Sequence, residues 1–250
     1  MLQETTGRVA RVLAMIRFQL KPLRAPLPFL AIAAALLAGC GSSSSSGNGV
    51  ASKTPAQIIE AAKAASAKAV SAHVAGSIVS GGKPISLDME LAAGKGGKGR
   101  ITVEGLSVQL IEVDKAVYIN GSAAFYTHLA GSAAATLLQG KWLKAPANNS
   151  NFASFSQLTD LGKLIDSTLA AHGTLKSAGT TTVNGQKVVG VTDSAKGGTL
   201  YVATTGEAYP VEIVKTGSDG GKVVFDRWNK PVTLKAPATS VNVNQLQSGH

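Results

Sequence analysis

Seven consecutive residues, Ile85 to Leu91, alternate between apolar and polar side chains without exception. Successive side chains of a β-strand point to opposite faces, so this pattern predicts a strand with one dry face and one wet face. Glycines at 81–82 and 94–99 flank the segment and predict hairpin loops. The alternation resumes at residue 101 and continues in short segments to residue 121. Four or five strands at this spacing indicate an antiparallel meander.

A second set of strands is predicted in the C-terminal part of the chain. Asn184-Gly185 lies between two β-branched segments and is the strongest short hairpin signal in the sequence. Further strands are expected at 200–204, 211–215 and 223–228, each bounded by glycine-containing turns. The segment 231–243 is interrupted by prolines, and we expect it to lie along an edge of the sheet.

Helices are predicted before and between the two sets of strands. Thr54 to Gln57 forms a capping box with proline at the first helical position, and we expect this helix to end near Ala72. A second capping box, Ser154 with Gln157, predicts a helix that reaches about Ala171. The alanine-rich segment 123–139 between them is also expected to be helical, although Gly131 weakens that prediction.

This order of elements predicts an α+β fold: one large, curved antiparallel sheet, or half-barrel, that wraps a few helices around an apolar cavity. Small alanine side chains on the first helix leave apolar volume unfilled against a wide sheet. The alternative is that sheet and helices close together without a cavity, and the residues alone leave it open.

The first forty residues have the composition of a targeting segment. Five basic residues and one acidic residue precede an apolar run from Leu27 to Ala38, which is shorter than the roughly 20 residues that span a bilayer. The run ends in Leu37-Ala38-Gly39-Cys40, which resembles a bacterial lipobox. Cleavage is therefore expected between Gly39 and Cys40, with the Cys40 thiol acylated, as by palmitate. Met15 would begin a more ordinary signal peptide than Met1.

The residues after Cys40 support a lipid anchor. Gly41 to Lys53 is rich in glycine and serine and predicts a tether with a reach of about 20 Å. The alternative, a buried core cysteine, fits this context poorly. We therefore expect a signal peptide at 1–39, a lipidated cysteine and tether at 40–53, a folded domain at 54–244 and a tail at 245–250. The protein would lie on the extracytoplasmic face of the cell membrane.

The sequence offers little that could carry catalysis or hold a cofactor. One cysteine cannot form an intrachain disulfide or a zinc ribbon. His73, His128 and His172 lie in unrelated contexts, and no G-x-S-x-G or complete phosphate loop occurs. Aromatic residues make up 5% of the chain, so a base-stacking nucleic-acid surface is not expected despite the net charge of +10. No enzyme activity, metal or cofactor is predicted.

Several short motifs recur in an order that resembles a known family. After the lipobox come Ser71 to Gly76, Val113 to Asn120 and Gly140-Lys-Trp142, followed by Thr182 to Gln186 and Asp226 to Val232. This series resembles the LppX/LprG-type actinobacterial lipoproteins, whose fold is similar to that of the LolA/LolB lipoprotein carriers. The resemblance covers most of residues 54–244. It implies a cavity that holds acylated lipids or lipoglycans and moves them through the cell envelope.

The leading hypothesis is a lipid-anchored, monomeric carrier without covalent chemistry, whose partners are an acylated lipid or lipoglycan, the membrane and a membrane transporter. A scaffold or sensory lipoprotein with a closed core is the second hypothesis, and an enzyme acting on envelope lipids is the third. The alternation predicts the side chains that line the cavity: Ile58, Leu87, Val103, Leu110, Ile119, Leu161 and Leu164.

Overall fold

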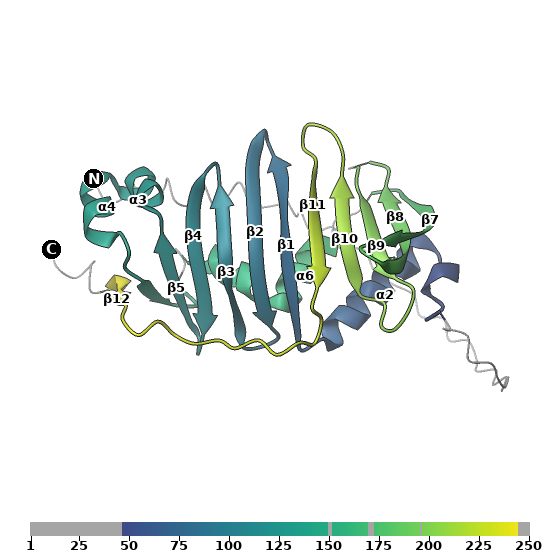
Figure 1. Cartoon of the computed structure of the whole chain (residues 1–250), viewed down its shortest axis with the longest axis horizontal. Coiled ribbons are helices and arrows are strands. Elements are labelled where there is room, and N and C mark those ends of the chain that lie inside the picture. The colour runs from purple at the N-terminus through teal and green to yellow at the C-terminus, as the bar shows by residue number, and fades with distance from the viewer. Residues whose placement is uncertain (1–46, 150–151, 170–172, 196, 245–250) are drawn as a thin grey trace, which may run out of the picture.

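The computed structural model describes residues 47–149, 152–169, 173–195 and 197–244. Within them, one sheet extends along the long axis of the molecule, with some of the helices behind it and others at one end (Figure 1). Twelve strands form this sheet in the order β12-β6-β5-β4-β3-β2-β1-β11-β10-β9-β8-β7. The strands are β1 Ser71–Ser80, β2 Lys83–Ala92, β3 Gly96–Val103, β4 Leu106–Val113, β5 Ala116–Gly121, β6 Leu143–Pro146, β7 Leu175–Val183, β8 Gln186–Asp193, β9 Thr199–Ala203, β10 Pro210–Lys215, β11 Gly221–Asp226 and β12 Val241–Asn242.

The sheet consists of two meanders that meet at one seam. Strands β1 to β5 pair in sequence order, as do β7 to β11, and the pairing of β1 with β11 joins the two sets. His73 is opposite Asp226 and Ile78 is opposite Gly221 in this seam. Among the strands of the described ranges, only β12 pairs in parallel, with β6, and the sheet remains open. The predicted α+β fold with a large, curved, mostly antiparallel sheet is thus confirmed.

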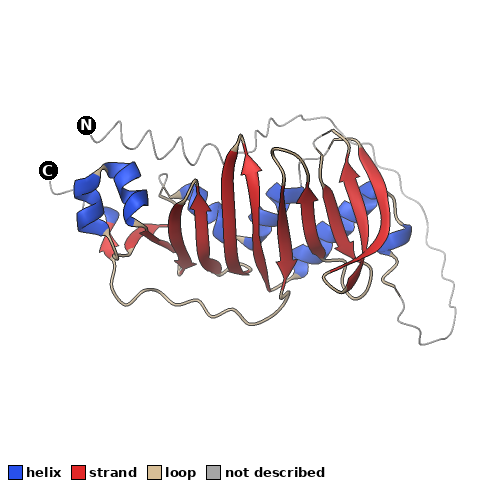
Figure 2. Cartoon of the chain, turned by 45° about the horizontal axis from the view of Figure 1, so that its top comes forward, coloured by secondary structure: helices blue, strands red, loops and turns tan. Residues whose placement is uncertain are grey.

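The helices form two groups. Helices α5, α6 and α2 follow one another behind the sheet, with α5 against β3 and β4 and α2 against β7 and β8 (Figure 2). Helices α3 and α4 form a separate pair beyond β5, at one end of the molecule. Their bounds, with the short 3₁₀ turn, are η1 Val50–Ser52, α2 Pro55–Lys68, α3 Ala123–Ala130, α4 Ser132–Leu138, α5 Ala153–Thr159 and α6 Leu161–Leu169.

One core connects the sheet to α2, α5 and α6. We call the face of the sheet toward these helices the inner face and the opposite face the outer face. The predicted alternation in β2 is confirmed, because Met89 and Leu91 are buried on the inner face while Asp88 is exposed on the outer face. The chain after β11 runs along the ends of the strands to the edge strand β12, as expected for the proline-interrupted segment (Figure 1).

The first helix ends earlier than predicted. Its capping box is confirmed: Thr54 Oγ1 accepts from the backbone N–H of Gln57, and the Gln57 side chain accepts from the N–H of Thr54. The helix ends at Lys68 instead of near Ala72, because the chain pairs as β1 from Ser71 onward. Alanine favours a helix, but in β1 the same backbone groups pair with strands on both sides, and Ala72 and Val74 are buried in the core.

The second predicted helix is two helices. The N-cap residue of α5 is Phe152, whose side chain makes no capping hydrogen bond, so the predicted capping box that begins at Ser154 is wrong. The backbone leaves the helical conformation at Asp160, where α5 ends. Asp160 Oδ1 then accepts from the backbone N–H of Lys163, as a capping residue does for a new helix. In segment 123–139, Gly131 likewise separates α3 from α4 with a φ of 88°.

Two glycine-rich segments are more ordered than predicted. The expected loop at 94–99 is only a short turn, and β3 already begins at Gly96. A Cβ atom at Gly99 would overlap the carbonyl oxygen of Asp88 on the neighbouring strand, so glycine is needed inside this strand. The expected tether also ends early, because Val50 is 1% exposed and belongs to the core.

Candidate functional site

The seven predicted cavity residues all belong to one apolar cluster between the inner face and the helices. Four of them are buried, at 1–3% exposure. The other three are partly exposed and pack against the cluster. The buried residues are Ile58, Leu110, Ile119 and Leu161, and the partly exposed ones are Leu87, Val103 and Leu164. The structure therefore brings the predicted residues together, in two distinct environments.

The exposure of apolar side chains on the inner face changes along the strands. At the end of β1 and β2 that the helices cover, Val74, Met89 and Leu91 are at most 2% exposed. Toward the other end of the same strands, Ile78 and Ile85 are partly exposed, and they face each other across the strand pair. The inner face is thus sealed at one end and only partly covered at the other.

The partly covered residues form a continuous band across six adjacent strands. The pairing registers place them directly opposite one another from β1 through β2 and β3 to β4, and again between β10 and β11. Across the β11–β1 seam, Val223 and Ile78 are diagonal neighbours, and each is opposite a glycine. All are aliphatic, and all are partly exposed. We call this set the apolar strip: Ile213, Val223, Ile78, Ile85, Leu87, Val103 and Leu106.

A polar contact fixes α5 over the sealed end of the inner face. Glu112 of β4 faces the helices, and its Oε2 accepts from Ser156 Oγ at 2.7 Å and from Thr159 Oγ1 at 2.5 Å. Thr159 is fully buried. A partly buried carboxylate is costly unless it is hydrogen-bonded, and two hydroxyl donors from one helix provide that compensation.

The predicted lipidation site, Gly39 and Cys40, lies outside the described residues. The nearest described residues are bound to the sheet: the Asn48 N–H donates to the Thr204 carbonyl at 2.8 Å, and its side-chain amide donates to Ala203 and Gly206. The chain therefore joins the folded domain beside β9, close to the end of the sheet opposite α3 and α4 (Figure 1).

Charged side chains gather on the outer face near the seam. His73 lies between two carboxylates, with Nδ1 2.6 Å from Asp226 Oδ1 and Nε2 3.0 Å from Asp88 Oδ1. A hydrogen bond from the Lys98 ammonium group lowers the pKa of Glu90, against a smaller effect of burial, and the charges of Lys98, Arg227 and His73 lower this pKa further.

No cluster of three His, Cys, Asp or Glu residues that could hold a metal ion occurs in the described part of the chain. None of the helices within the described ranges has both the length and the hydropathy to cross a bilayer. His128 lies in α3, and His172 is outside the described residues.

Sequence reasoning missed three polar residues of this region. Glu112 and Thr159 lie 47 positions apart, so no local pattern connects them. His73 was expected at an element end or on the surface, yet it bridges two strands whose residues are 15 and 153 positions away. Only the strand order, which long-range pairing sets, brings these side chains together.

The fold defined by this sheet and its helices is similar to that of solved structures. The crystal structure of LprF from Mycobacterium bovis is similar with a TM-score of 0.51 and 16% sequence identity, over 74% of this chain and 97% of LprF. The lipoprotein LppX from Mycobacterium tuberculosis is similar with a TM-score of 0.46 and 18% identity, over 73% of this chain and 100% of LppX. No protein-family model and no curated protein sequence matches the chain. The predicted resemblance to LppX/LprG-type proteins is thus confirmed at the level of the fold.

Proposed function

We propose that this protein is a membrane-anchored lipoprotein that binds an acylated lipid or lipoglycan on the inner face of its sheet and carries it within the cell envelope. The apolar strip is the part of the inner face that would contact the acyl chains. The remaining predicted residues, Ile58, Leu110, Ile119 and Leu161, would form the floor that supports it. No covalent chemistry is part of this proposal.

The observation that supports it is the continuity of the apolar strip. Isolated exposed aliphatic residues are common on protein surfaces, but a contiguous apolar band marks a surface that another apolar group covers. Six strands have five spacings of about 4.8 Å, so the strip is roughly 24 Å long. That length suits an extended fatty-acyl chain that lies across the strands.

Acyl chains provide a sufficient driving force for binding at such a strip. Removing one methylene group from water contributes about 0.8 kcal/mol, so about ten methylenes contribute roughly 8 kcal/mol before the costs of ordering the chain. No charged side chain belongs to the strip, so an uncharged acyl chain can cover it without leaving an ionic group unpaired. Leu164 of α6 borders the cluster from the helix side and would contact the same chain.

The anchor is proposed at Cys40, with residues 41–46 as the tether. Two or more acyl chains on Cys40 would hold the protein at the membrane far more firmly than one chain would. Because Asn48 is bound to the sheet beside β9, an anchor only eight positions before it would keep the β9 end of the domain close to the membrane.

Native mass spectrometry of the full-length protein, released from detergent micelles, tests the proposal. We expect co-purifying lipid at about one molecule per protein. In the variant Val103→Asp this lipid should be lost, because a carboxylate in the strip would contact the acyl chains. Thr102→Asp is the matched control, since Thr102 is the next residue of β3 and faces the outer side.

Two outcomes would contradict the proposal. One is a folded wild-type protein without lipid from a related host. The other is equal lipid occupancy in Val103→Asp and Thr102→Asp. Either result would favour the second candidate, a scaffold or sensory lipoprotein with a closed core, for which the tight burial of Leu110 and Leu161 at 1% exposure is the supporting observation.

A further inference from the structure

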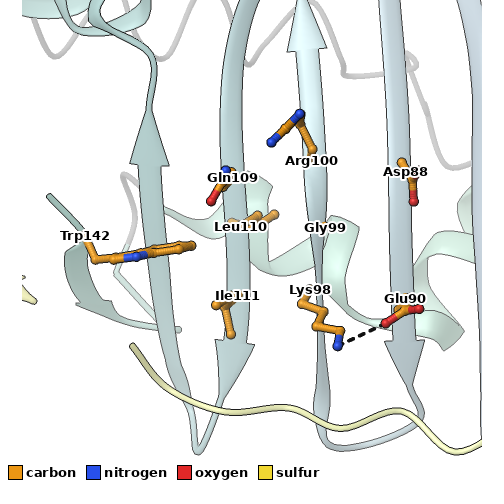
Figure 3. A pocket seen from close by; sticks show the side chains of 9 residues that line it. All are labelled: Asp88, Glu90, Lys98, Gly99, Arg100, Gln109, Leu110, Ile111 and Trp142. Atoms are coloured by element: carbon orange, nitrogen blue, oxygen red, sulfur yellow. Dashed lines mark ion pairs between the residues drawn. The ribbon is translucent and has the colours of Figure 1, made fainter. Parts of the chain in front are cut away.

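A shallow groove of about 410 Å³ lies on the outer face, opposite the candidate lipid site. Strands β2, β3 and β4 form its floor, and the chain just before β6 forms one wall (Figure 3). Its lining combines charged and polar side chains with apolar ones, among them one large aromatic side chain: Asp88, Glu90, Lys98, Gly99, Arg100, Gln109, Leu110, Ile111 and Trp142.

The carboxylates of the groove already have partners, and Arg100 does not share them. Asp88 contacts His73, and Glu90 pairs with Lys98 at 3.1 Å and with Arg227 at 3.0 Å. Arg100 is opposite Asp88 in the β2–β3 register, yet it is exposed and forms no ion pair within the described residues. Figure 3 shows its guanidinium group directed toward Gln109, away from Asp88.

Trp142 provides a flat apolar surface beside these polar groups. In Figure 3 its indole ring is seen edge-on, reaching over β5 toward β4, with Gln109 and Arg100 on one side and Ile111 on the other. The ring is partly exposed, and its N–H has no acceptor among the described residues. The other tryptophan differs: Trp228 stacks on Tyr209 at 4.4 Å and donates to the Pro210 carbonyl.

Three planar side chains thus converge with their hydrogen-bonding groups free: the Arg100 guanidinium, the Gln109 amide and the Trp142 indole. We propose that this groove binds a sugar unit that carries a carboxylate. The apolar face of a sugar ring packs on an indole, its neighbouring hydroxyls suit the paired donor and acceptor of an amide, and a carboxylate suits the two-pronged guanidinium.

The residues of the groove favour this ligand over a nucleic acid or an acidic peptide. A nucleic acid would need several stacking aromatics, and Trp142 is the single aromatic residue that lines the groove in the described part of the chain. An acidic peptide would use Arg100 and Lys98 as cations, but Lys98 is paired with Glu90 and contributes little net charge. The sheet separates the groove from the apolar strip, so the inference does not depend on the proposed function.

Isothermal titration calorimetry on the full-length protein in mild detergent tests this proposal. The probe is a tetrasaccharide of alternating glucuronic acid and N-acetylglucosamine, compared with neutral chitotetraose and with hexaglutamate. A second arm uses glucuronosyl diacylglycerol in phosphatidylcholine vesicles, since the same sugar could belong to an envelope polysaccharide or to a lipid headgroup. Binding in the first arm indicates a polysaccharide source, and binding in the second arm alone indicates a headgroup.

We expect Arg100→Gln and Trp142→Leu each to weaken binding of the glucuronate probe by at least tenfold. Lys176→Gln is the matched control: it removes an exposed cation of β7, at the far edge of the sheet from the groove, and should leave the affinity within twofold. The proposal is overturned if neither arm shows binding, if Arg100→Gln binds as the wild type does, or if chitotetraose or hexaglutamate binds as tightly as the glucuronate probe. Circular dichroism of each variant verifies that it is folded.

Discussion

The imidazole Nδ1 of His73 lies 2.6 Å from the Asp226 carboxylate, across the single strand pair that joins the two meanders. The other ring nitrogen contacts Asp88 on β2, so one side chain connects three neighbouring strands. His73 thus connects β11, β1 and β2 through its two ring nitrogens, at the centre of the sheet.

A double-mutant cycle measures the contact between His73 and Asp226. We expect His73→Ala and Asp226→Ala each to lower the free energy of unfolding, with a coupling of about 0.5–1 kcal/mol, because both side chains are partly exposed and screened by water. The coupling should shrink at high salt. Urea unfolding of the four proteins provides the measurement, and additive effects at low salt would show that the contact contributes nothing.

Tyr126 makes the most deeply buried polar contact of α3. Its ring is fully buried, and its hydroxyl oxygen accepts from the backbone N–H of Gly121 at 3.0 Å. Tyr126→Phe leaves this N–H without a partner, so we expect a loss of about 1–2 kcal/mol of stability. Phe125→Leu is a control that keeps the contact while it changes the neighbouring ring, and an unchanged urea midpoint in Tyr126→Phe would contradict the assigned role.

The same tyrosine predicts a loss of stability in alkali. Burial raises the pKa of Tyr126 above its usual value of 10.0, although the contact with Gly121 opposes this rise. Above pH 10 the unfolded chain loses the phenol proton while the folded chain keeps it, so stability falls as the pH increases. Unfolding between pH 9 and about 11 should be steeper with pH for the wild type than for Tyr126→Phe.

The lowered pKa of Glu90 predicts a loss of stability in acid. Its pKa in the folded protein is below the usual value of 4.5, mainly because of the hydrogen bond from Lys98. The stabilisation is complete above pH 4.5 and is lost as the pH falls through the lowered pKa. We expect the melting temperature of Glu90→Gln to fall less steeply with decreasing pH than that of the wild type. Glu60→Gln removes an exposed ion pair with Lys63 within α2, and it should leave this pH dependence unchanged.

The contact between α5 and the sheet can be tested at Thr159. Thr159→Val keeps the shape of the side chain but removes one of the two hydroxyl donors to the partly buried carboxylate of Glu112. We expect a loss of about 1–3 kcal/mol. Thr136→Val on α4, whose hydroxyl bonds only within its own helix, is the control and should change stability by less than about 0.5 kcal/mol. Equal effects of the two substitutions would show that Glu112 does not depend on Thr159.

The sequence predicts the faces of this sheet well and the positions along its strands poorly. Alternation correctly assigns Leu87 and Met89 to one face, because side-chain direction is a local property of a strand. It does not reveal that Met89 is sealed while Leu87 remains partly exposed. That difference depends on where α5 and α6 lie over the sheet, which contacts far apart in the sequence decide.

The outer-face groove illustrates the same limit. Arg100, Gln109 and Trp142 come from β3, β4 and the chain before β6, and each alone is an ordinary wet-face or loop residue. Their convergence requires the pairing register of neighbouring strands and the path of the chain after α4. Local patterns contain neither, so sequence analysis found the residues of the inner face and missed this groove.

Gly99 provides a stringent test of the sheet itself. A Cβ atom there would overlap the backbone of Asp88 and Met89 on β2, so Gly99→Ala must push two paired strands apart. We expect a loss of about 2–4 kcal/mol, in the range of severe core changes. Gly162→Ala is the matched control, because its Cβ would meet only Asp160 Oδ1 at 3.4 Å and alanine favours the helix, so stability should stay equal or rise by up to about 1 kcal/mol. Both free energies follow from urea unfolding, and a tolerated Gly99→Ala would show that β2 and β3 are further apart than described.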